Sequence, residues 1–222
     1  MPSGAVLPVR GDVRRVYGRL GRIYGLIEEY LEGGLRRRGL QRLGLAPGER
    51  VLELGCGTGC TLVMMVGMTG AGGCICGIDA TPRMVQLARH RLEKAGRGGM
   101  VGLFLADARA LPFRDGAFDT VYASAVLELF DTPDIPVVLG EARRVLRAGG
   151  RLGLASMPRE GHERSPGLRL YEWAHRAFPR WASCRPIYVE ESVRQAGLEV
   201  HGAEEVRLGG IFPMKVVVAR RP

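Results

Sequence analysis

The segment from Glu53 to Gly59 combines an acid with three alternating glycines, Gly55, Gly57 and Gly59, directly after an apolar run. In an open α/β sheet, ligands bind at the carboxyl ends of the strands, and residues without Cβ atoms let the backbone approach a ligand closely. A dinucleotide-binding turn would need its third glycine at the position of Cys60, and Glu53 would place a carboxylate near the pyrophosphate. The segment therefore favours a cationic ligand, such as one carrying an amino-acid ammonium and a sulfonium, over a nicotinamide dinucleotide.

Two further acids follow the next two predicted strands along the chain. Asp79 could accept both hydroxyls of a ribose, a role that nucleotide-binding folds share. Asp107 could accept a hydrogen bond from an adenine amino group, with Ala80 and Met84 as flanking apolar surface. Each acid alone could merely cap a turn or a helix. Three acids at the ends of three successive strands argue against coincidence and indicate a nucleoside site.

The elements that must position these acids alternate between strands and amphipathic helices, which is typical of a parallel sheet with helices on both faces. Thr58 and Thr81 stand where helix caps are expected. Strands are predicted over Arg50–Leu54, Cys74–Ile78, Met100–Ala106, Phe118–Ala123 and Arg151–Ser156. Helices are predicted from about Thr58 to Met68, from Thr81-Pro82 through Ala95, and from about Pro133 to Leu146, the last one stopped by Gly149-Gly150. A final helix, Val189–Ala196, precedes the strands Leu198–Arg207 and Met214–Ala219, which could form a hairpin at the sheet edge.

A chain of 222 residues is long enough for one α/β domain, and a single domain over 1–222 is the expectation. Residues 1–46 precede the sheet and contain a basic amphipathic stretch, 13–31, which could be one helix or two short ones. Residues 47–156 form the predicted core, 157–185 look like an insertion, and 186–222 hold the last helix and the hairpin.

The composition describes an ordinary globular protein, with 46% hydrophobic and 25% charged residues. The net charge of +9 invites a nucleic-acid or anionic-membrane partner, but the excess is almost all arginine and is equally compatible with a solvated surface. No apolar run is long enough to span a membrane, and the first residues lack a signal-peptide layout, so a cytoplasmic protein is expected. The five cysteines fit neither a metal-ligand nor a disulfide pattern, and we expect reduced, buried thiols.

Four segments resemble the successive motifs of the class I methyltransferases that depend on S-adenosylmethionine (SAM): VLELGCGTG, GIDATPRM, LADARALPFRDGAFDTVYAS and RVLRAGGRL. The resemblance covers roughly Pro47 to Ser156. Within that superfamily the chain is most similar to the ubiquinone/menaquinone-biosynthesis C-methyltransferase and phospholipid N-methyltransferase group. The resemblance implies a Rossmann-like, mostly parallel seven-stranded sheet with an antiparallel terminal strand.

The resemblance also implies SAM as the cofactor and S-adenosylhomocysteine as the product, and it assigns residues by position. Ser124, at the end of a predicted strand, would line the methyl-donor side. The methionine part would be held by Glu53, Gly55, Cys56, Gly57 and Gly59, the ribose by Asp79, and the adenine by Asp107 and Ala108, beside Ala80 and Met84. No metal is implied.

Methyl transfer to carbon or oxygen needs a group that takes a proton, and Glu128 and His162 are the foremost candidates, ahead of His175 and Tyr188. Aromatic residues on the first segment, on the insertion and just after the insertion could line an apolar acceptor site under a lid. These are Tyr17, Tyr24, Trp173 and Tyr188. The family often has Tyr-Asp where this chain has Tyr24-Gly25, and a His near the position of Glu128, so the departures concern the acceptor and not the cofactor.

The expected acceptor is a small, partly apolar molecule of the quinone-precursor or lipid-headgroup kind, and the basic first segment could touch anionic lipid at the membrane surface. An RNA methyltransferase is the alternative that the net charge favours, although the sequence lacks the N/D-P-P-Y/F and Pro-Cys motifs of nucleic-acid enzymes. A SAM-binding regulatory protein without catalysis is a third possibility. The sequence does not indicate an oligomeric state.

Overall fold

The structure is a computed structural model that describes residues 33–70, 72–163, 185–208 and 212–222. Residues 33–43 are helical and lead into the first strand. The labelled elements follow in the order β1 (Arg50–Leu54), α2 (Cys60–Thr69), β2 (Cys74–Asp79), α3 (Pro82–Lys94), β3 (Val101–Leu105), β4 (Phe118–Ser124), the 3-10 helix η1 (Leu127–Leu129), α4 (Asp134–Val145), β5 (Leu146–Ser156), α6 (Val189–Gln195), β6 (Glu199–Leu208) and β7 (Phe212–Arg220).

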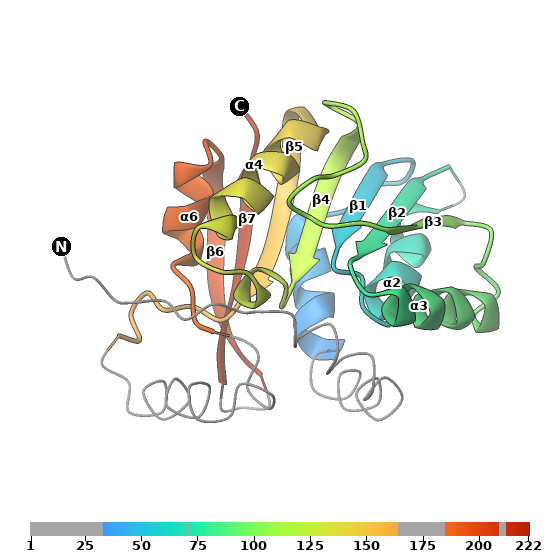
Figure 1. Cartoon of the computed structure of the whole chain (residues 1–222), viewed down its shortest axis with the longest axis horizontal. Coiled ribbons are helices and arrows are strands. Elements are labelled where there is room, and N and C mark those ends of the chain that lie inside the picture. Colours follow the sequence, from blue (N-terminus) through green and yellow to red (C-terminus); the bar gives the residue numbers. More distant parts are fainter. Residues whose placement is uncertain (1–32, 71, 164–184, 209–211) are drawn as a thin grey trace.

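The described strands form one seven-stranded sheet in the order β3-β2-β1-β4-β5-β7-β6 (Figure 1). Strands β1 to β5 are parallel, whereas β7 lies antiparallel between β5 and β6. The predicted fold class is therefore confirmed, including the antiparallel terminal strand and the hairpin at one edge.

Apolar side chains from the two faces of the sheet pack against two groups of helices. Helix 33–43, α2 and α3 cover one face, where residues such as Leu40, Met65 and Leu92 pack on Val51 and Tyr122. Helices α4 and α6 cover the other face through a larger core that includes Val138, Val193 and Leu152. Because both faces are covered, ligands reach the sheet only at the ends of its strands.

The boundary between α4 and β5 differs from the prediction. The helix ends at Val145, and β5 begins at once with the buried Leu146, which pairs with Phe118. The pair Gly149-Gly150 therefore lies inside the strand and does not separate helix from strand. A register shift follows Phe118, and Gly149 takes a positive φ of 70° there while its N–H donates to the Arg221 carbonyl. The glycine is needed for this irregularity, because residues with a Cβ rarely adopt that conformation.

Two smaller expectations are also corrected. Helix α2 begins one to two residues later than predicted, with Gly59 at the cap position in a left-handed conformation and without a side-chain cap. Thr58 does not cap it, and its Oγ1 lies 3.4 Å from Cys60 Sγ. The four described cysteines are free, as expected, but Cys74 is exposed. Burial, with Cys74 beside it, raises the pKa of the Cys76 thiol to about 12, so Cys76 stays protonated.

The predicted amphipathic stretch at 13–31, most of the insertion at 157–185 and Cys184 lie outside the described residues. Among the residues that are described, no helix has the length and apolarity needed to cross a membrane.

Candidate functional site

The predicted ligand-binding turn lies at the carboxyl end of β1, in the middle of the sheet. Gly55, Gly57 and Gly59 all have positive φ values, of 62°, 51° and 81°. A Cβ added at Gly55 would lie 2.5 Å from Val126 Cγ2, and one added at Gly59 would lie 2.9 Å from the backbone of Ala88 in α3. Two of the three glycines are thus required by close packing as well as by conformation, and together they leave a backbone surface that a ligand can approach.

Asp79, the last residue of β2, lies beside this turn and holds it. Its Oδ2 accepts a hydrogen bond from Gly57 N at 3.0 Å, and its Oδ1 accepts one from Thr81 N at 2.8 Å. The carboxylate therefore joins the turn after β1 to the start of α3. Both the turn and the carboxylate occupy the position predicted for a methionine and ribose site.

The third predicted acid, Asp107, follows β3 and is engaged by an arginine two residues later. Arg109 donates to Asp107 Oδ1 from its backbone N at 3.0 Å and from Nε at 3.1 Å, and to Oδ2 from Nη2 at 2.8 Å. Its Nη1 also donates to Asp134 Oδ2, at 2.8 Å. The neighbouring Ala108 is buried and packs in the core.

The end of β4 lies directly across from the glycine turn, since Leu54 and Ala123 are partners in the sheet. Ser124 Oγ is buried and has no hydrogen-bond partner among the described residues. The next residue, Ala125, is the one described non-glycine with a positive φ, 54°, and its N–H donates to the Ala155 carbonyl at 2.8 Å. A strained backbone and an unsatisfied buried hydroxyl at the same strand end indicate a site built for a ligand.

Glu53 and the apolar candidates line the same edge at different depths. The Glu53 carboxylate sits on β1 directly before the turn, in a residue that is 3% exposed. Cys56 and Met84 are also buried, while Ala80 and Asp79 are partly exposed beside them. A buried carboxylate below a turn of backbone amides fits a ligand that carries both a cation and hydrogen-bond acceptors. The residues present therefore fit a SAM molecule laid across the ends of β1, β2 and β4.

Glu128 lies one step further along the edge, on η1, and is 1% exposed. Its Oε1 accepts a hydrogen bond from Met157 N at 2.7 Å, and its Oε2 accepts one from Ser156 Oγ at 3.3 Å. The residues after β5 then run beside the segment before α6, because Ile187 N donates to the Met157 carbonyl at 3.0 Å. Glu128 thus organises the strand end where an acceptor would be expected.

The other acceptor-side candidates lie apart from Glu128. His162 Nε2 lies 3.0 Å from Glu205 Oε1 on β6, which is three strands beyond β4, about 14 Å at the normal strand spacing. Tyr188, at the start of α6, is 45% exposed and lies under the Arg159 guanidinium. Tyr17, Tyr24, Trp173 and His175 lie outside the described residues. The structure therefore brings Glu128, but not His162, close to the cofactor side of the edge.

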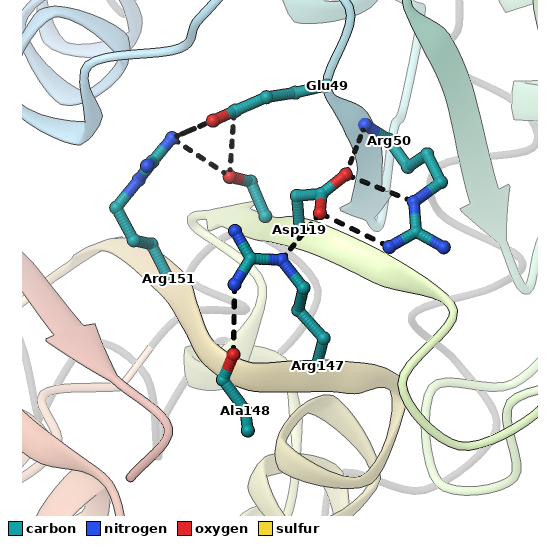
Figure 2. A network of polar contacts seen from close by, with 7 residues as sticks. Glu49, Arg50, Asp119, Arg147, Ala148 and Arg151 are labelled. Atoms are coloured by element: carbon teal, nitrogen blue, oxygen red, sulfur yellow. Dashed lines mark hydrogen bonds and ion pairs between the residues drawn. The ribbon is translucent and has the colours of Figure 1, made fainter.

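The opposite, amino-terminal edge of the sheet carries a different polar network (Figure 2). Asp119 accepts hydrogen bonds from Arg50 Nε at 3.0 Å and Arg147 Nε at 2.7 Å, while Arg151 donates to Glu49 at 2.6 Å. The hydrogen bond from Arg50, followed by those from the Arg50 backbone and Arg147, holds the pKa of Asp119 far below its usual range despite partial burial. This network joins β1, β4 and β5 by pairing carboxylates with arginines of other strands, so we interpret it as structural.

Sequence reasoning missed two contributors to the carboxyl-terminal edge. Arg109 stands only two residues from Asp107, but its bond to Asp134 crosses 25 positions of the sequence. A Cβ at position 55 would collide with Val126, which follows the neighbouring strand β4, so only glycine fits there. A basic residue at that short spacing from a predicted ligand-binding acid was the only available signal.

Comparison with known proteins now adds to the geometry. Residues 51–150 match a family described as a methyltransferase domain. A 2-phytyl-1,4-naphthoquinone methyltransferase of Synechococcus elongatus is 29% identical over 88% of this chain and 85% of its own. A demethylmenaquinone methyltransferase of Tropheryma whipplei is 33% identical over 72% of this chain and 65% of its own. A crystal structure of a SAM-dependent methyltransferase from Aquifex aeolicus matches with a TM-score of 0.64 and 22% identity, over 84% of this chain and 89% of that one, which concerns the fold alone.

Proposed function

Because the chain is a class I SAM-dependent methyltransferase, we propose that it transfers the methyl group of SAM to a small, partly apolar acceptor of the quinone-precursor kind. The observation that carries this proposal is the similarity to the naphthoquinone methyltransferase, which extends over 88% of this chain. That similarity reaches well beyond the matched domain at 51–150 and therefore includes segments on the acceptor side.

Within this proposal, each strand end holds one part of the cofactor. The Glu53 carboxylate attracts the ammonium of the methionine part of SAM. The backbone amides of the Gly55–Gly59 turn approach the carboxylate of that same methionine part. Asp79 accepts the ribose hydroxyls, and Asp107 accepts the adenine amino group. Ser124 Oγ, buried without a partner among the described residues, donates or accepts near the methyl-donor side. When bound, SAM supplies a methyl group already activated by a sulfonium for in-line displacement.

The protein's own contribution is then orientation, exclusion of water and removal of one proton from the acceptor. Glu128 is the better placed of the two proposed proton acceptors, because it lies at the carboxyl-terminal edge next to Ser156. His162 lies against Glu205 on β6, the edge strand of the sheet. The aromatic residues Tyr17, Tyr24 and Trp173 remain proposed as the apolar lining, together with a lid formed by 13–31 and 157–185.

The test is a competition among acceptor classes. Purified full-length protein is incubated with methyl-labelled SAM and, in separate reactions, with a phytyl naphthoquinol, demethylmenaquinol, phosphatidylethanolamine vesicles or unmodified tRNA. The proposal expects label in a quinol product and S-adenosylhomocysteine in equal amount. Label in phosphatidylethanolamine alone would move the acceptor to lipid headgroups, and label in tRNA alone would overturn the proposal.

The basic charge favours one second candidate, an RNA methyltransferase. Helix α3 and the turn after it present Arg83, Arg89, Lys94 and Arg97, for which no ion pair is formed within the described residues. Such a surface would bind phosphates in a salt-dependent way. A fall in tRNA affinity with added salt, together with methylated tRNA in the competition above, would support this candidate. A regulatory SAM-binding protein would give no labelled product with any acceptor.

A further inference from the structure

Arg109 forms a fork between two carboxylates at the adenine end of the proposed site. Three of its hydrogen bonds go to Asp107, from the backbone N, Nε and Nη2, and a fourth goes from Nη1 to Asp134. Asp134 is in the first turn of α4. The guanidinium is thereby held at both ends, and its pKa is raised first by the side-chain hydrogen bonds that it donates to Asp107 and second by the one that it donates to Asp134.

This arrangement fixes the direction of the Asp107 carboxylate. Bonds from Nε and Nη2 reach different oxygens, so the plane of the carboxylate is set by the plane of the guanidinium. A lysine in the same place could offer only a point charge with rotating donors. Of the hydrogen bonds from Arg109 to Asp107, two reach Oδ1 and one reaches Oδ2.

A fixed carboxylate can distinguish adenine from hypoxanthine, whereas a rotating one can adapt to both. Adenine presents an amino donor at C6 beside an N1 acceptor. Hypoxanthine presents an oxygen acceptor at C6 beside an N1–H donor. A carboxylate aimed at the amino group would face the hypoxanthine oxygen and repel it, but a carboxylate free to turn could accept the N1–H instead.

We propose that Arg109 is a positioning residue that fixes Asp107 toward the adenine amino group and so sets the preference of this protein for adenosyl over inosyl cofactors. The proposal rests on the proposed function, in which Asp107 contacts adenine. Arg109 does not touch the reacting atoms, and its effect is on recognition. Its neighbour Arg114 lies in the same loop, is exposed, and serves as a matched control.

The experiment is calorimetric titration of the full chain with S-adenosylhomocysteine and with S-inosylhomocysteine. The wild type is expected to prefer the adenosyl compound by at least about tenfold, since one well-formed charged hydrogen bond distinguishes them. Arg109→Ala should weaken adenosyl binding about fivefold to tenfold while inosyl binding changes less than about twofold, so the preference narrows. Arg109→Lys should keep more of the preference for the adenosyl compound than Arg109→Ala does. Asp134→Asn should reduce that preference less than Arg109→Ala does. Arg114→Ala should leave both dissociation constants unchanged.

Asp107→Ala distinguishes recognition by Asp107 from positioning by Arg109, because alanine cannot accept a hydrogen bond from the adenine amino group. If this variant keeps the wild-type preference, Asp107 does not recognise adenine, and the cofactor assignment at β3 fails together with the role of Arg109. If Asp107→Ala loses the preference but Arg109→Ala keeps it, the assignment stands and the positioning role is overturned. A loss of adenosyl and inosyl affinity in equal proportion in Arg109→Ala would also overturn it, because it would indicate a structural role only. Thermal unfolding of each variant checks that the fold is retained.

Discussion

The two edges of the central sheet use the same residue types for different purposes. At the amino-terminal edge, Asp119 and Glu49 meet arginines from other strands, with Arg50 and Asp119 separated by 69 positions and Arg151 and Glu49 by 102 (Figure 2). At the carboxyl-terminal edge, Asp79 accepts hydrogen bonds from backbone amides of the turns around it. The first arrangement ties strands together, and the second holds the backbone of the glycine turn in place.

The difference follows from what precedes and follows each strand. The turn after β1 has positive φ angles at Gly55 and Gly57, and the turn after β4 has one at Ala125, which open the backbone toward a ligand. The starts of β1, β4 and β5 are joined by side-chain hydrogen bonds. Variants at the carboxyl-terminal edge should therefore change ligand binding and turnover, and those at the amino-terminal edge should change stability.

The largest effect is expected from Asp79→Ala. Hydrogen bonds to a charged group contribute about 1.5–3 kcal/mol each before water compensates, so the loss of two ribose bonds should raise the SAM dissociation constant at least about 100-fold. The loss of the amide contacts to Gly57 and Thr81 adds to the effect by loosening the turn. Calorimetry measures it. Asp119→Ala removes the same group from the other edge and should leave SAM affinity within about twofold; equal losses in both variants would erase the distinction between the edges.

The next effect concerns Glu128 and turnover. If Glu128 takes the acceptor proton, Glu128→Gln should lower kcat about 100-fold or more, because the amide can still accept the hydrogen bond from Met157 N but cannot take a proton. SAM affinity should remain near the wild-type value. Steady-state kinetics with the quinol acceptor measure both. Near-normal kcat in Glu128→Gln, with a large loss in Glu128→Ala, would show that Glu128 acts by holding the end of β5.

Much of the carboxyl-terminal edge was predictable because its signals are local. Glu53 and Asp79 lie at or near the ends of apolar strands, and the glycines follow directly after Leu54, so the alternation of strands and helices in the sequence predicts that they share one edge. The fold followed from the same alternation. The start of β5 was missed because Gly149-Gly150 is typical of a helix end, whereas here the positive φ at Gly149 serves a bulge inside a strand.

The amino-terminal network could not be predicted from the sequence. Arg50, Asp119 and Arg147 come from separate elements, and nothing local distinguishes them from the other arginines and acids of a chain that has 32 basic and 23 acidic residues. The contact of Arg109 with Asp134 has the same origin. Long-range ion pairs depend on which strands become neighbours, and this is decided by the packing of the whole sheet.

The smallest effect is expected for the stability contributed by Asp119, and its pH dependence tests the structural role of the amino-terminal edge. The pKa of Asp119 is lowered in the folded protein, chiefly by the side-chain hydrogen bond from Arg50, so the folded state binds fewer protons than the unfolded state. The contribution is then fully present above the unfolded pKa of about 3.9 and is lost as the pH falls from about 5 toward the lower folded pKa. Asp119→Asn should lower the free energy of unfolding by about 1–2 kcal/mol at pH 7 and by a smaller amount at pH 3. Solvent screening of the half-exposed arginines reduces both values. Urea unfolding at pH 7, 5, 4 and 3 measures the difference.

Asp115→Asn is the control for the loss of charge alone, because the Asp115 side chain is 76% exposed although it forms an ion pair with Arg144. Unfolding curves for Asp119→Asn and the wild type that stay parallel from pH 7 to 3 would contradict the assignment, because a carboxylate with the same pKa in both states contributes nothing that varies with pH.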